Sequence, residues 1–457
     1  MENYDILILG GGPGGYVAAI KGAQLGFKVA LVEKDAIGGV CLNEGCIPTK
    51  TLLKSAKVYR LMKHSKDYGI TVDTASIKPN WDEILVRKST VVKRLTTGVQ
   101  GLLKKNGVKV YSGYGEVINN TTIKVNSDTL SAKNIILATG ASPIIPPIPG
   151  LKEGFDNQFV YTSKTLLQYP KIPKSLVIIG GGVIGIEFAT LFSSFGTKVT
   201  IIERLDQILM TIDDDIRNAY LKLISKESIE IITKANVTKI NSNSVTYEMN
   251  GQSKTIESEI VLLSVGMKPN IDSFKSLNLT MNKQGIQVNE QMQTSIPHIY
   301  AIGDITGKMM LAHAASAEGI IAIETIAGKK VRFSYDSVPS AVYGFPEIAW
   351  IGITEKEAKE RKIDYKVSQF PLLANGRSLA EGETDGFVKF LVNPNNGEII
   401  GAHILASNAT DLLSETVLAR DSEATIADIA NSIHLHPSVS EAVMEAAIGA
   451  ILKPIHL

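Results

Sequence analysis

Cysteine is scarce in this chain, since its 457 residues include only two, Cys41 and Cys46. A secreted protein of this size that depended on disulfides would usually carry more, so one close pair predicts redox or metal chemistry in a reducing compartment. Structural zinc generally needs four Cys or His ligands at short spacings, and no histidine lies within 15 residues of the pair. Redox chemistry is therefore favoured, and no metal site is expected.

The chain also lacks an excess of charge and a long apolar run. Its 47 basic and 46 acidic residues give a formal net charge of +1, so neither nucleic acid nor a membrane surface is expected as a partner. No apolar run approaches 18 residues, and no basic segment precedes a hydrophobic one at the start, which predicts a cytoplasmic location. The length and an apolar fraction of 44% predict a globular protein of two to four domains.

What the sequence does contain is a repeat. An apolar strand, a glycine cluster, a helical stretch and a second strand ending in an acid occur from Ile6 to Glu33 and again from Leu176 to Glu203. In both units, 23 residues separate the first glycine from the acid. The glycines of the G-x-G-x-x-G pattern are Gly10, Gly12 and Gly15 in the first unit and Gly180, Gly182 and Gly185 in the second.

A G-x-G-x-x-G pattern by itself is weak evidence, but between a strand and a helix, with an acid at the end of the next strand, it indicates a dinucleotide site. The first glycine permits a tight turn, the second admits a pyrophosphate, and the third lets helix and strand pack closely. The helix N-terminus faces the phosphate charge. We expect Glu33 and Glu203 to accept hydrogen bonds from ribose hydroxyls, so the chain should bind two nucleotides. The alternative is a pair of tight turns without a ligand.

The two cysteines follow the first unit directly. Residues five apart on a regular helix have Cα atoms about 8.6 Å apart, whereas a disulfide tolerates at most about 7 Å. Cys41 and Cys46 can therefore pair only where the backbone is distorted, and Gly45 and Pro48 suit a distortion. A strained, accessible disulfide is more easily reduced, as a catalytic one must be. The alternative is two unrelated buried thiols.

The rest of the chain divides into segments that differ in their sequence pattern. Residues 54–66 and 82–105 are polar on one face and predict helices. The proline-rich segment 143–150 predicts a domain boundary. After about residue 336, strands and helices are segregated, which is typical of an α+β domain. The predicted strands there are 388–391 and 399–405, and the predicted helices are 412–420 and 440–452.

Four motifs in order carry a resemblance. The segment 38–50 contains both cysteines, the next two motifs are Ala138-Thr139-Gly140 and Ile299 to Asp304, and residues 434–441 read His-Leu-His-Pro-Ser-Val-Ser-Glu. Together they resemble the redox signature, the two further FAD-contacting turns and the C-terminal His–Glu motif of the pyridine nucleotide–disulfide oxidoreductases. The resemblance covers the whole chain. It implies an α/β fold with two Rossmann-like domains, for FAD and NAD, and a C-terminal α+β dimerisation domain.

The resemblance also implies a role for each chemical group. Cys41 is the interchange thiol that faces a dithiol substrate, and Cys46 faces the flavin. Lys50 lies near the flavin and pairs with Glu187. The remaining implied residues are the acid–base His436 with its orienting Glu441, and the cofactor contacts Thr139, Gly140, Asp304 and Gly266. By spacing alone, His436 is no better a candidate than His434.

Domain boundaries follow from the same resemblance. An FAD domain is expected over 1–147, completed by 270–337, with an NAD domain inserted over 148–269 and an interface domain over 338–457. The protein is expected to be a homodimer whose active sites each use both chains. Two departures from the family pattern are Met267, where an arginine is usual, and Tyr343 to Pro346, which replaces a Thr-His-Pro and is interpreted as an interface variation.

Glu203 indicates which reaction the chain performs. An acid at this strand end binds the adenosine ribose and repels a 2′-phosphate, which predicts NAD rather than NADP. Cys46 is the last cysteine, so the chain has no second cysteine pair near its C-terminus. This excludes a member of the family that needs such a pair. Among the members of the family that the chain resembles, these features imply NAD⁺-dependent oxidation of a dihydrolipoyl dithiol, with the lipoyl domain of an acyltransferase or a lipoyl carrier protein as the expected partner. The alternatives are a glutathione-reductase-like enzyme and a non-catalytic flavin- or NADH-binding module.

Overall fold

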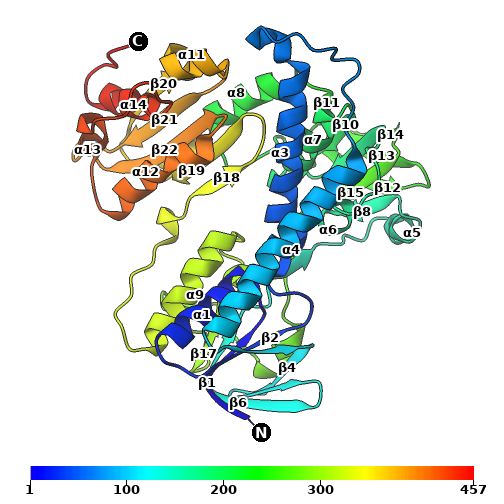
Figure 1. Ribbon diagram of the computed structural model, residues 1–457, viewed down its shortest axis with the longest axis vertical. Coiled ribbons are helices and arrows are strands. Elements are labelled where there is room, and N and C mark those ends of the chain that lie inside the picture. Colours follow the sequence, from blue (N-terminus) through cyan, green and yellow to red (C-terminus); the bar gives the residue numbers. More distant parts are fainter. Residues whose placement is uncertain (1) are drawn as a thin grey trace.

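The first glycine unit folds at the centre of a mixed sheet in the computed structural model, which describes residues 2–457 (Figure 1). The 7-stranded sheet has the order β3-β2-β1-β6-β5-β4, with β17 beside β6, and α1 (Pro13–Gln24) connects its first two strands. The strands are β1 (Glu2–Leu9), β2 (Val29–Glu33), β3 (Lys109–Ser112), β4 (Gly115–Asn119), β5 (Thr122–Val125), β6 (Asp128–Leu137) and β17 (Ile299–Ala301).

Strand β17 brings a distant part of the sequence into this sheet. It runs parallel to β6, with Ile299 opposite Ile135, and α9 (Ala312–Ile326) then packs against α1. The parallel strands β2 and β17 and the second half of β1 are continuous apolar runs buried on both faces, as expected of parallel strands covered by helices. The segment after β17 is therefore held beside the first glycine turn, although the whole second unit separates the two in sequence.

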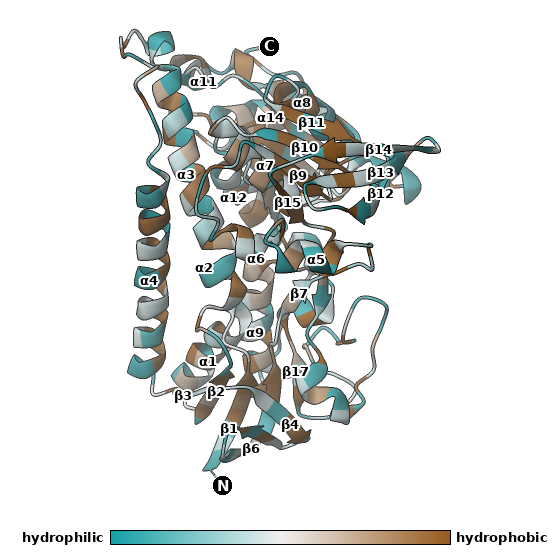
Figure 2. Cartoon of the chain, turned by 90° about the vertical axis from the view of Figure 1, so that its right-hand side faces the viewer, coloured by the Kyte–Doolittle hydropathy of each residue, from teal (hydrophilic) through white to brown (hydrophobic). Residues whose placement is uncertain are grey.

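The second glycine unit forms a parallel sheet of its own. Its 5-stranded order is β11-β10-β9-β15-β8, and α7 (Val183–Ser194) connects β9 to β10. A separate antiparallel sheet, β12-β13-β14, lies beside it (Figure 2). The strands are β8 (Val160–Thr162), β9 (Ser175–Ile179), β10 (Lys198–Ile202), β11 (Ile229–Ile232), β12 (Ala235–Ile240), β13 (Ser244–Met249), β14 (Gln252–Glu257) and β15 (Ile260–Leu263), with the helices α5 (Leu151–Asp156), α6 (Ser163–Leu166) and α8 (Asp214–Ile224).

The chain enters and leaves this second unit through one short ladder. β7 (Ala141–Pro143) pairs antiparallel with β16 (Met267–Pro269), so that Ala141 lies opposite Pro269. Met267, the departure from the family pattern, is thus part of this ladder. The arrangement makes residues 144–266 an insertion whose two ends lie side by side.

The C-terminal part is an antiparallel sheet with helices, as the segregated sequence pattern predicts. Its order is β18-β19-β22-β21-β20. The strands are β18 (Ser340–Val342), β19 (Glu347–Gly352), β20 (Lys366–Pro371), β21 (Phe387–Val392) and β22 (Ile399–Ala406), and the helices are α10 (Glu355–Glu360), α11 (Gly376–Glu381), α12 (Ala409–Asp421), α13 (Ile426–Asn431) and α14 (Glu441–Ile451). Leu405 and Ile348 of this sheet join the hydrophobic core under the second glycine unit.

Three helices near the redox cysteines complete the fold. They are α2 (Gly39–Glu44), α3 (Cys46–Lys63) and α4 (Trp81–Lys105), and α3 packs against both α4 and α7. The α3–α4 pair extends along the molecule from the first sheet towards the C-terminal domain (Figure 1). Although α4 has 25 residues, neither it nor any other helix within residues 2–457 combines the length and apolarity that a bilayer crossing requires.

Candidate redox and nucleotide-binding site

The two glycine turns have closely matching geometry. Gly10 and Gly180 adopt φ angles of +111° and +107°, in the region that favours glycine. A Cβ on Gly15 would lie 1.8 Å from the carbonyl oxygen of Gly10, and one on Gly185 would lie 2.3 Å from that of Gly180. The third glycine of each pattern therefore allows α1 and α7 to approach the preceding strand.

The middle glycines face open space. A Cβ on Gly182 would meet nothing within 4 Å, and one on Gly12 would only touch Gly39 at 4.0 Å. Both residues cap a helix, and neither α1 nor α7 has a side-chain cap for its first N–H groups. A pyrophosphate fits this combination of space and free N–H donors, so both turns suit a dinucleotide.

The acid at the end of each second strand is held in the same way. Glu33 accepts a hydrogen bond from the N–H of Gly11 at 2.6 Å, and Glu203 accepts one from Gly181 at 2.7 Å. The other oxygen of each carboxylate accepts from the N–H two residues downstream, at 2.7 and 2.8 Å. Each ionised oxygen keeps a further lone pair, so both acids are oriented to receive ribose hydroxyls.

The cysteine pair lies across a break between two helices. α2 ends at Glu44, α3 begins at Cys46, and Gly45 between them has φ −144° and ψ −104°. This is the backbone distortion that the five-residue spacing requires. Both cysteines are present as free thiols, and they are partly buried and hydrogen-bonded to each other. The two sulfurs of the predicted redox pair are therefore brought together at this break.

The two thiols differ strongly in acidity. The hydrogen bond from Cys41, together with the nearby charge of Lys50, outweighs burial and lowers the pKa of Cys46 to about 7. The same hydrogen bond and burial raise the pKa of Cys41. Because a thiol of lower pKa is the better leaving group in disulfide exchange, Cys46 is prepared to leave as a thiolate.

Lys50 belongs to an ion pair beneath the cysteines. Its ammonium donates to both oxygens of Glu187 at 2.9 and 2.8 Å, so the structure contains the expected pair. The ammonium also lies 4.3 Å from the ring centroid of Tyr343, whose N–H donates to Glu187 at 3.2 Å. The interpretation of Tyr343 as an interface variation was incomplete, because the residue contacts the redox site. Long-range packing between α7 and β18, the strand that ends at Val342, brings it there.

The second expected FAD turn is locked by a residue that sequence analysis missed. The hydroxyl of Thr139 donates to the carbonyl oxygen of Asn270 at 2.6 Å, and the Asn270 amide donates back to the carbonyl oxygen of Thr139 at 3.0 Å. Gly140 has φ +69° and open space around its Cα. Gly266 has φ +114° and accepts a hydrogen bond from the N–H of Ile144 beside the β7–β16 ladder.

Asp304 lies directly after β17, beside the first glycine turn. Burial raises its pKa to about 6, and no hydrogen bond to its carboxylate occurs within residues 2–457. A half-buried acid with free acceptors fits the hydroxyls of a flavin ribitol. Sequence analysis missed its neighbour Glu318, which is fully buried and accepts hydrogen bonds from the N–H of Gly303 and the hydroxyl of Tyr335.

The C-terminal motif separates its two histidines. The His436 Nδ1 lies 2.9 Å from Glu441, and its side chain is 79% exposed. Since an ionised carboxylate only accepts, Nδ1–H donates and Nε2 stays free as a base. Burial would raise the pKa of Glu441, but the hydrogen bonds from the backbone N–H of Ser438 and from the His436 side chain outweigh it and lower the pKa. His434 is instead 7% exposed and bound to Glu415, so the structure favours His436 as the available group.

One chain does not bring all these residues together. Cys41, Cys46, Lys50 and Glu187 form one cluster, whereas α14, which begins at Glu441, packs on β20, β21 and α13. Exposed apolar side chains surround the histidine motif and the C-terminal segment. They are Ile433, Leu435, Leu452, Ile455 and Leu457. This face suits contact with another chain more than contact with water.

The fold and the site together define a class, a thiol–disulfide oxidoreductase with two dinucleotide-binding units. Residues 4–319 match the model of the pyridine nucleotide-disulphide oxidoreductase family, and residues 338–447 match the dimerisation domain of that family. The chain belongs to the pyridine nucleotide-disulphide oxidoreductase family.

Similar proteins cover between 71% and 99% of the chain. Dihydrolipoyl dehydrogenase from Bacillus subtilis (strain 168) is 42% identical over 475 residues, 99% of each chain. That from Acholeplasma laidlawii is 54% identical over 325 residues, 71% of this chain and 96% of that protein. Among solved structures, LpdA from Mycobacterium tuberculosis has a TM-score of 0.90 at 26% identity, over 98% of this chain and 99% of that one. The HOCl-induced flavoprotein disulfide reductase RclA from Escherichia coli has a TM-score of 0.87 at 28% identity, over 99% and 100%.

These comparisons decide several expectations. They confirm the fold class, an oxidoreductase activity, and FAD and NAD as the cofactors. The dimerisation-domain match supports the expected homodimer.

Proposed function

We propose that the chain is a dihydrolipoyl dehydrogenase, which oxidises a dihydrolipoyl dithiol and reduces NAD⁺. The observation that carries the proposal is the cysteine pair at the helix break, where Cys41 and Cys46 lie on either side of Gly45 and the neighbouring thiol and the charge of Lys50 lower the pKa of Cys46. An oxidant of dithiols needs one sulfur that accepts attack and another that leaves. The full-length similarity to dihydrolipoyl dehydrogenases supports the choice of substrate.

In the first step a substrate thiolate attacks Sγ of Cys41 in the oxidised pair, and the Cys41–Cys46 bond breaks. Cys46 leaves with the electron pair as a thiolate, stabilised by the Lys50 charge and the nearby thiol. The second substrate thiolate then attacks the substrate sulfur that is bonded to Cys41. The bond to Cys41 breaks, and Cys41 is released as a thiolate. The substrate has become a cyclic disulfide and lost two electrons, and the protein pair has gained them.

Bound FAD supplies the two-electron relay from this thiol pair to NAD⁺, which leaves as NADH. The residues that fit the FAD are Gly10, Gly12, Gly15, Glu33, Lys50, Thr139, Gly140 and Asp304. For the NAD⁺ they are Gly180, Gly182, Gly185, Glu187, Glu203 and Gly266. We assign residues 1–147 and 270–337 to the FAD domain, 148–269 to the NAD domain and 338–457 to the interface domain.

His436 takes the substrate protons in this proposal. Its Nε2 is free and its Nδ1 is anchored to Glu441, whose lowered pKa keeps the carboxylate ionised and able to stabilise an imidazolium. We propose that His436 and Glu441 act on the cysteine pair of the partner subunit. The exposure of His436 and the apolar side chains around it support a site that two chains share.

The partner that delivers the dithiol is a lipoyl domain of an acyltransferase component or a lipoyl carrier protein in this proposal. A tethered lipoyl arm requires an approach to Cys41, which lies in α2 and is partly exposed. We place the protein in the cytoplasm, where a reducing environment maintains its two thiols.

A direct assay tests the proposal. The purified holoenzyme is given dihydrolipoamide with NAD⁺ or NADP⁺, and separately glutathione disulfide with NADH or NADPH. We expect fast NADH formation from dihydrolipoamide, and at least about tenfold slower use of NADP⁺, because Glu203 opposes a 2′-phosphate. Faster reduction of glutathione disulfide by NADPH would establish a glutathione-reductase-like enzyme instead. If no combination of thiol or disulfide substrate and nucleotide is turned over, the protein is a binding module and not an enzyme of this class.

A further inference from the structure

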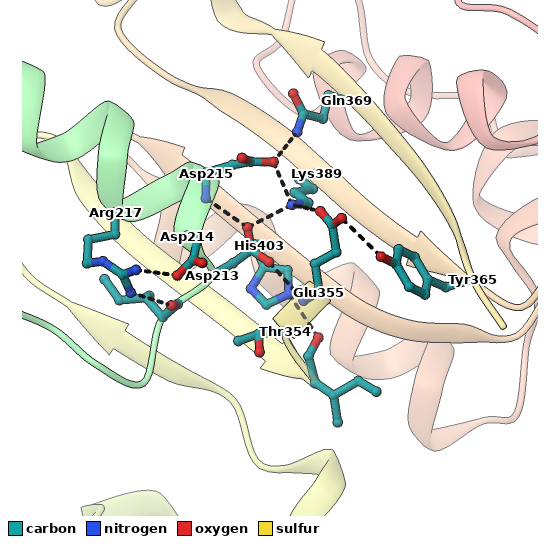
Figure 3. Close-up of polar contacts among 12 residues, drawn as sticks. Asp213, Asp214, Asp215, Arg217, Thr354, Glu355, Tyr365, Gln369, Lys389 and His403 are labelled. Atoms are coloured by element: carbon teal, nitrogen blue, oxygen red, sulfur yellow. Dashed lines mark hydrogen bonds and ion pairs between the residues drawn. The ribbon is translucent and has the colours of Figure 1, made fainter. Parts of the chain in front are cut away.

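A buried charged cluster connects the second glycine unit to the interface domain. Lys389 on β21 is fully buried, and its ammonium contacts Asp213 at 2.7 Å, Asp215 at 2.7 Å and Glu355 at 3.0 Å (Figure 3). Burial alone would lower the pKa of Lys389, but the carboxylates outweigh it and raise the pKa. The three N–H groups of the ammonium are thus matched by three acceptors that come from two domains.

Asp213 is the residue through which this cluster reaches the nucleotide side. It caps α8 by accepting the N–H of Asp215 at 3.1 Å, and its other oxygen accepts the N–H of Glu355 at 3.0 Å. Its side chain is 1% exposed. The N-terminus of α8 is therefore attached to β21 and to the start of α10, in the interface domain.

The segment immediately before Asp213 forms one wall of the second glycine turn. The N–H of Leu209 donates to the carbonyl oxygen of Gly181 at 3.0 Å, and Ile208 packs against Gly181. Gly181 also donates to Glu203, at the start of the same segment. At its far end, Arg217 donates to the carbonyl oxygen of Ile212 at 3.2 Å. Residues 204–212 thus extend from the ribose-binding acid to the charged cluster.

In the first glycine unit, too, a following segment donates a backbone hydrogen bond to the glycine turn, but that segment leads to a different part of the molecule. There the N–H of Gly38 donates to the carbonyl oxygen of Gly11 at 2.8 Å, and the segment continues directly into α2 and Cys41. In the second unit the corresponding segment continues into Asp213. The anchor of the first segment lies in its own domain, whereas the anchor of the second lies in the interface domain.

We propose that Lys389 is a positioning residue for NAD⁺: through Asp213 it holds residues 204–212 against the second glycine turn, so that NAD⁺ affinity depends on the interface domain. This inference rests on the proposed function for the identity of the nucleotide. Without the ammonium, the buried carboxylate of Asp213 would lose its charge partner and face the partly exposed carboxylates of Asp215 and Glu355, so the three would separate. The N-terminus of α8 and the wall before it would move with them.

The test compares Lys389→Met with the wild-type holoenzyme. We expect the Kd for NAD⁺, measured by calorimetry on the oxidised protein, to rise about tenfold, and the KM for NAD⁺ to rise with it. Amide exchange within 205–212 should accelerate. FAD content and the reduction of the cysteine pair by dihydrolipoamide in the absence of NAD⁺ should stay at wild-type values. Lys366→Met is the matched control, since its ammonium binds the Ala450 carbonyl oxygen from β20, outside the cluster.

A second variant keeps the test decisive if Lys389→Met does not fold. Asp213→Asn retains an oxygen that can cap α8 but removes one charge from the ion pair, and we expect the same weakening of NAD⁺ binding. The inference is overturned if either variant melts at a lower temperature while the Kd for NAD⁺ and the exchange of 205–212 stay as in the wild type. A wild-type protein that binds no NAD⁺ would instead reject the proposed function itself.

Discussion

The charge of Lys50 is the residue-scale feature that prepares the thiol pair. It contributes to the Cys46 pKa of about 7, with the hydrogen bond from Cys41 as the larger cause. In Lys50→Met the ammonium is lost while Glu187 and the hydrogen bond from Cys41 remain, so we expect the pKa of Cys46 to rise by part of its shift. A raised pKa means less thiolate at a given pH. At pH 7 the thiolate fraction should therefore fall below its wild-type value.

Alkylation of the reduced protein by iodoacetamide measures this shift, with Cys46 followed by mass spectrometry across a pH series. The midpoint of the rate should move upward in Lys50→Met and stay near the wild-type value in Lys50→Arg, which keeps the charge. An unchanged midpoint in both variants would show that Lys50 has no influence on the thiol.

The residues that could be predicted from the sequence are those that belong to a short motif with a characteristic spacing. The glycine turns, Glu33, Glu203 and the cysteine pair all lie within short motifs. Asn270 and Lys389 could not be found in this way, because each has a partner more than 100 positions away in sequence. Lys389 is 176 positions from Asp213, for example, and only the packing of the C-terminal sheet against α8 makes them neighbours. Nothing in the local sequence around either residue indicates an ion pair.

At the scale of elements, the two nucleotide turns allow a matched pair of substitutions. A methyl group on Gly182 would occupy open space, so Gly182→Ala should melt like the wild type and bind NAD⁺ at least about tenfold more weakly, because that space is where the pyrophosphate fits. A methyl group on Gly185 would meet the Gly180 carbonyl oxygen at 2.3 Å, so Gly185→Ala should lose about 1–3 kcal/mol of stability.

Thermal melts and NAD⁺ titrations of both variants measure these outcomes. Gly182→Ala acts as the control for a general effect of adding a methyl group to the turn. If it binds NAD⁺ like the wild type, the space beside Gly182 is not the pyrophosphate site.

The elements themselves were predicted well where the apolar pattern is long, and poorly at one helix start. The helix predicted over 54–66 corresponds to α3, which begins at Cys46 in the structure. The earlier start was missed because a proline such as Pro48 usually indicates in a sequence that no helix is present. Pro48 lies in the first turn of α3, where an N–H has no partner within the helix, so proline is tolerated. The predicted helix 82–105 agrees with α4 to within one residue. The order of strands in the sheets depends on long-range pairing, and β17 in the first sheet is the clearest case.

At the scale of the whole molecule, the domains are joined by shared packing and not only by linkers. Leu405 and Ile348 of the C-terminal sheet lie in one hydrophobic core with Phe188 and Tyr220 of the second unit. The boundaries at residues 147, 269 and 337 stay predictions. The sequence could predict a dimer only through its resemblance to a family. The physical reason for one is the exposed apolar face around His436, which becomes visible only after folding.

Subunit mixing tests the central claim most directly, namely a dithiol-oxidising site shared between two chains. Cys46→Ser and His436→Gln are each expected to be inactive as homodimers. After subunit exchange, a heterodimer carries one fully wild-type site and one doubly defective site. Random pairing should therefore restore NAD⁺-dependent dihydrolipoamide oxidation to at most about a quarter of the wild-type rate. If heterodimers form and no activity returns, or if a monomer is fully active, the account is contradicted.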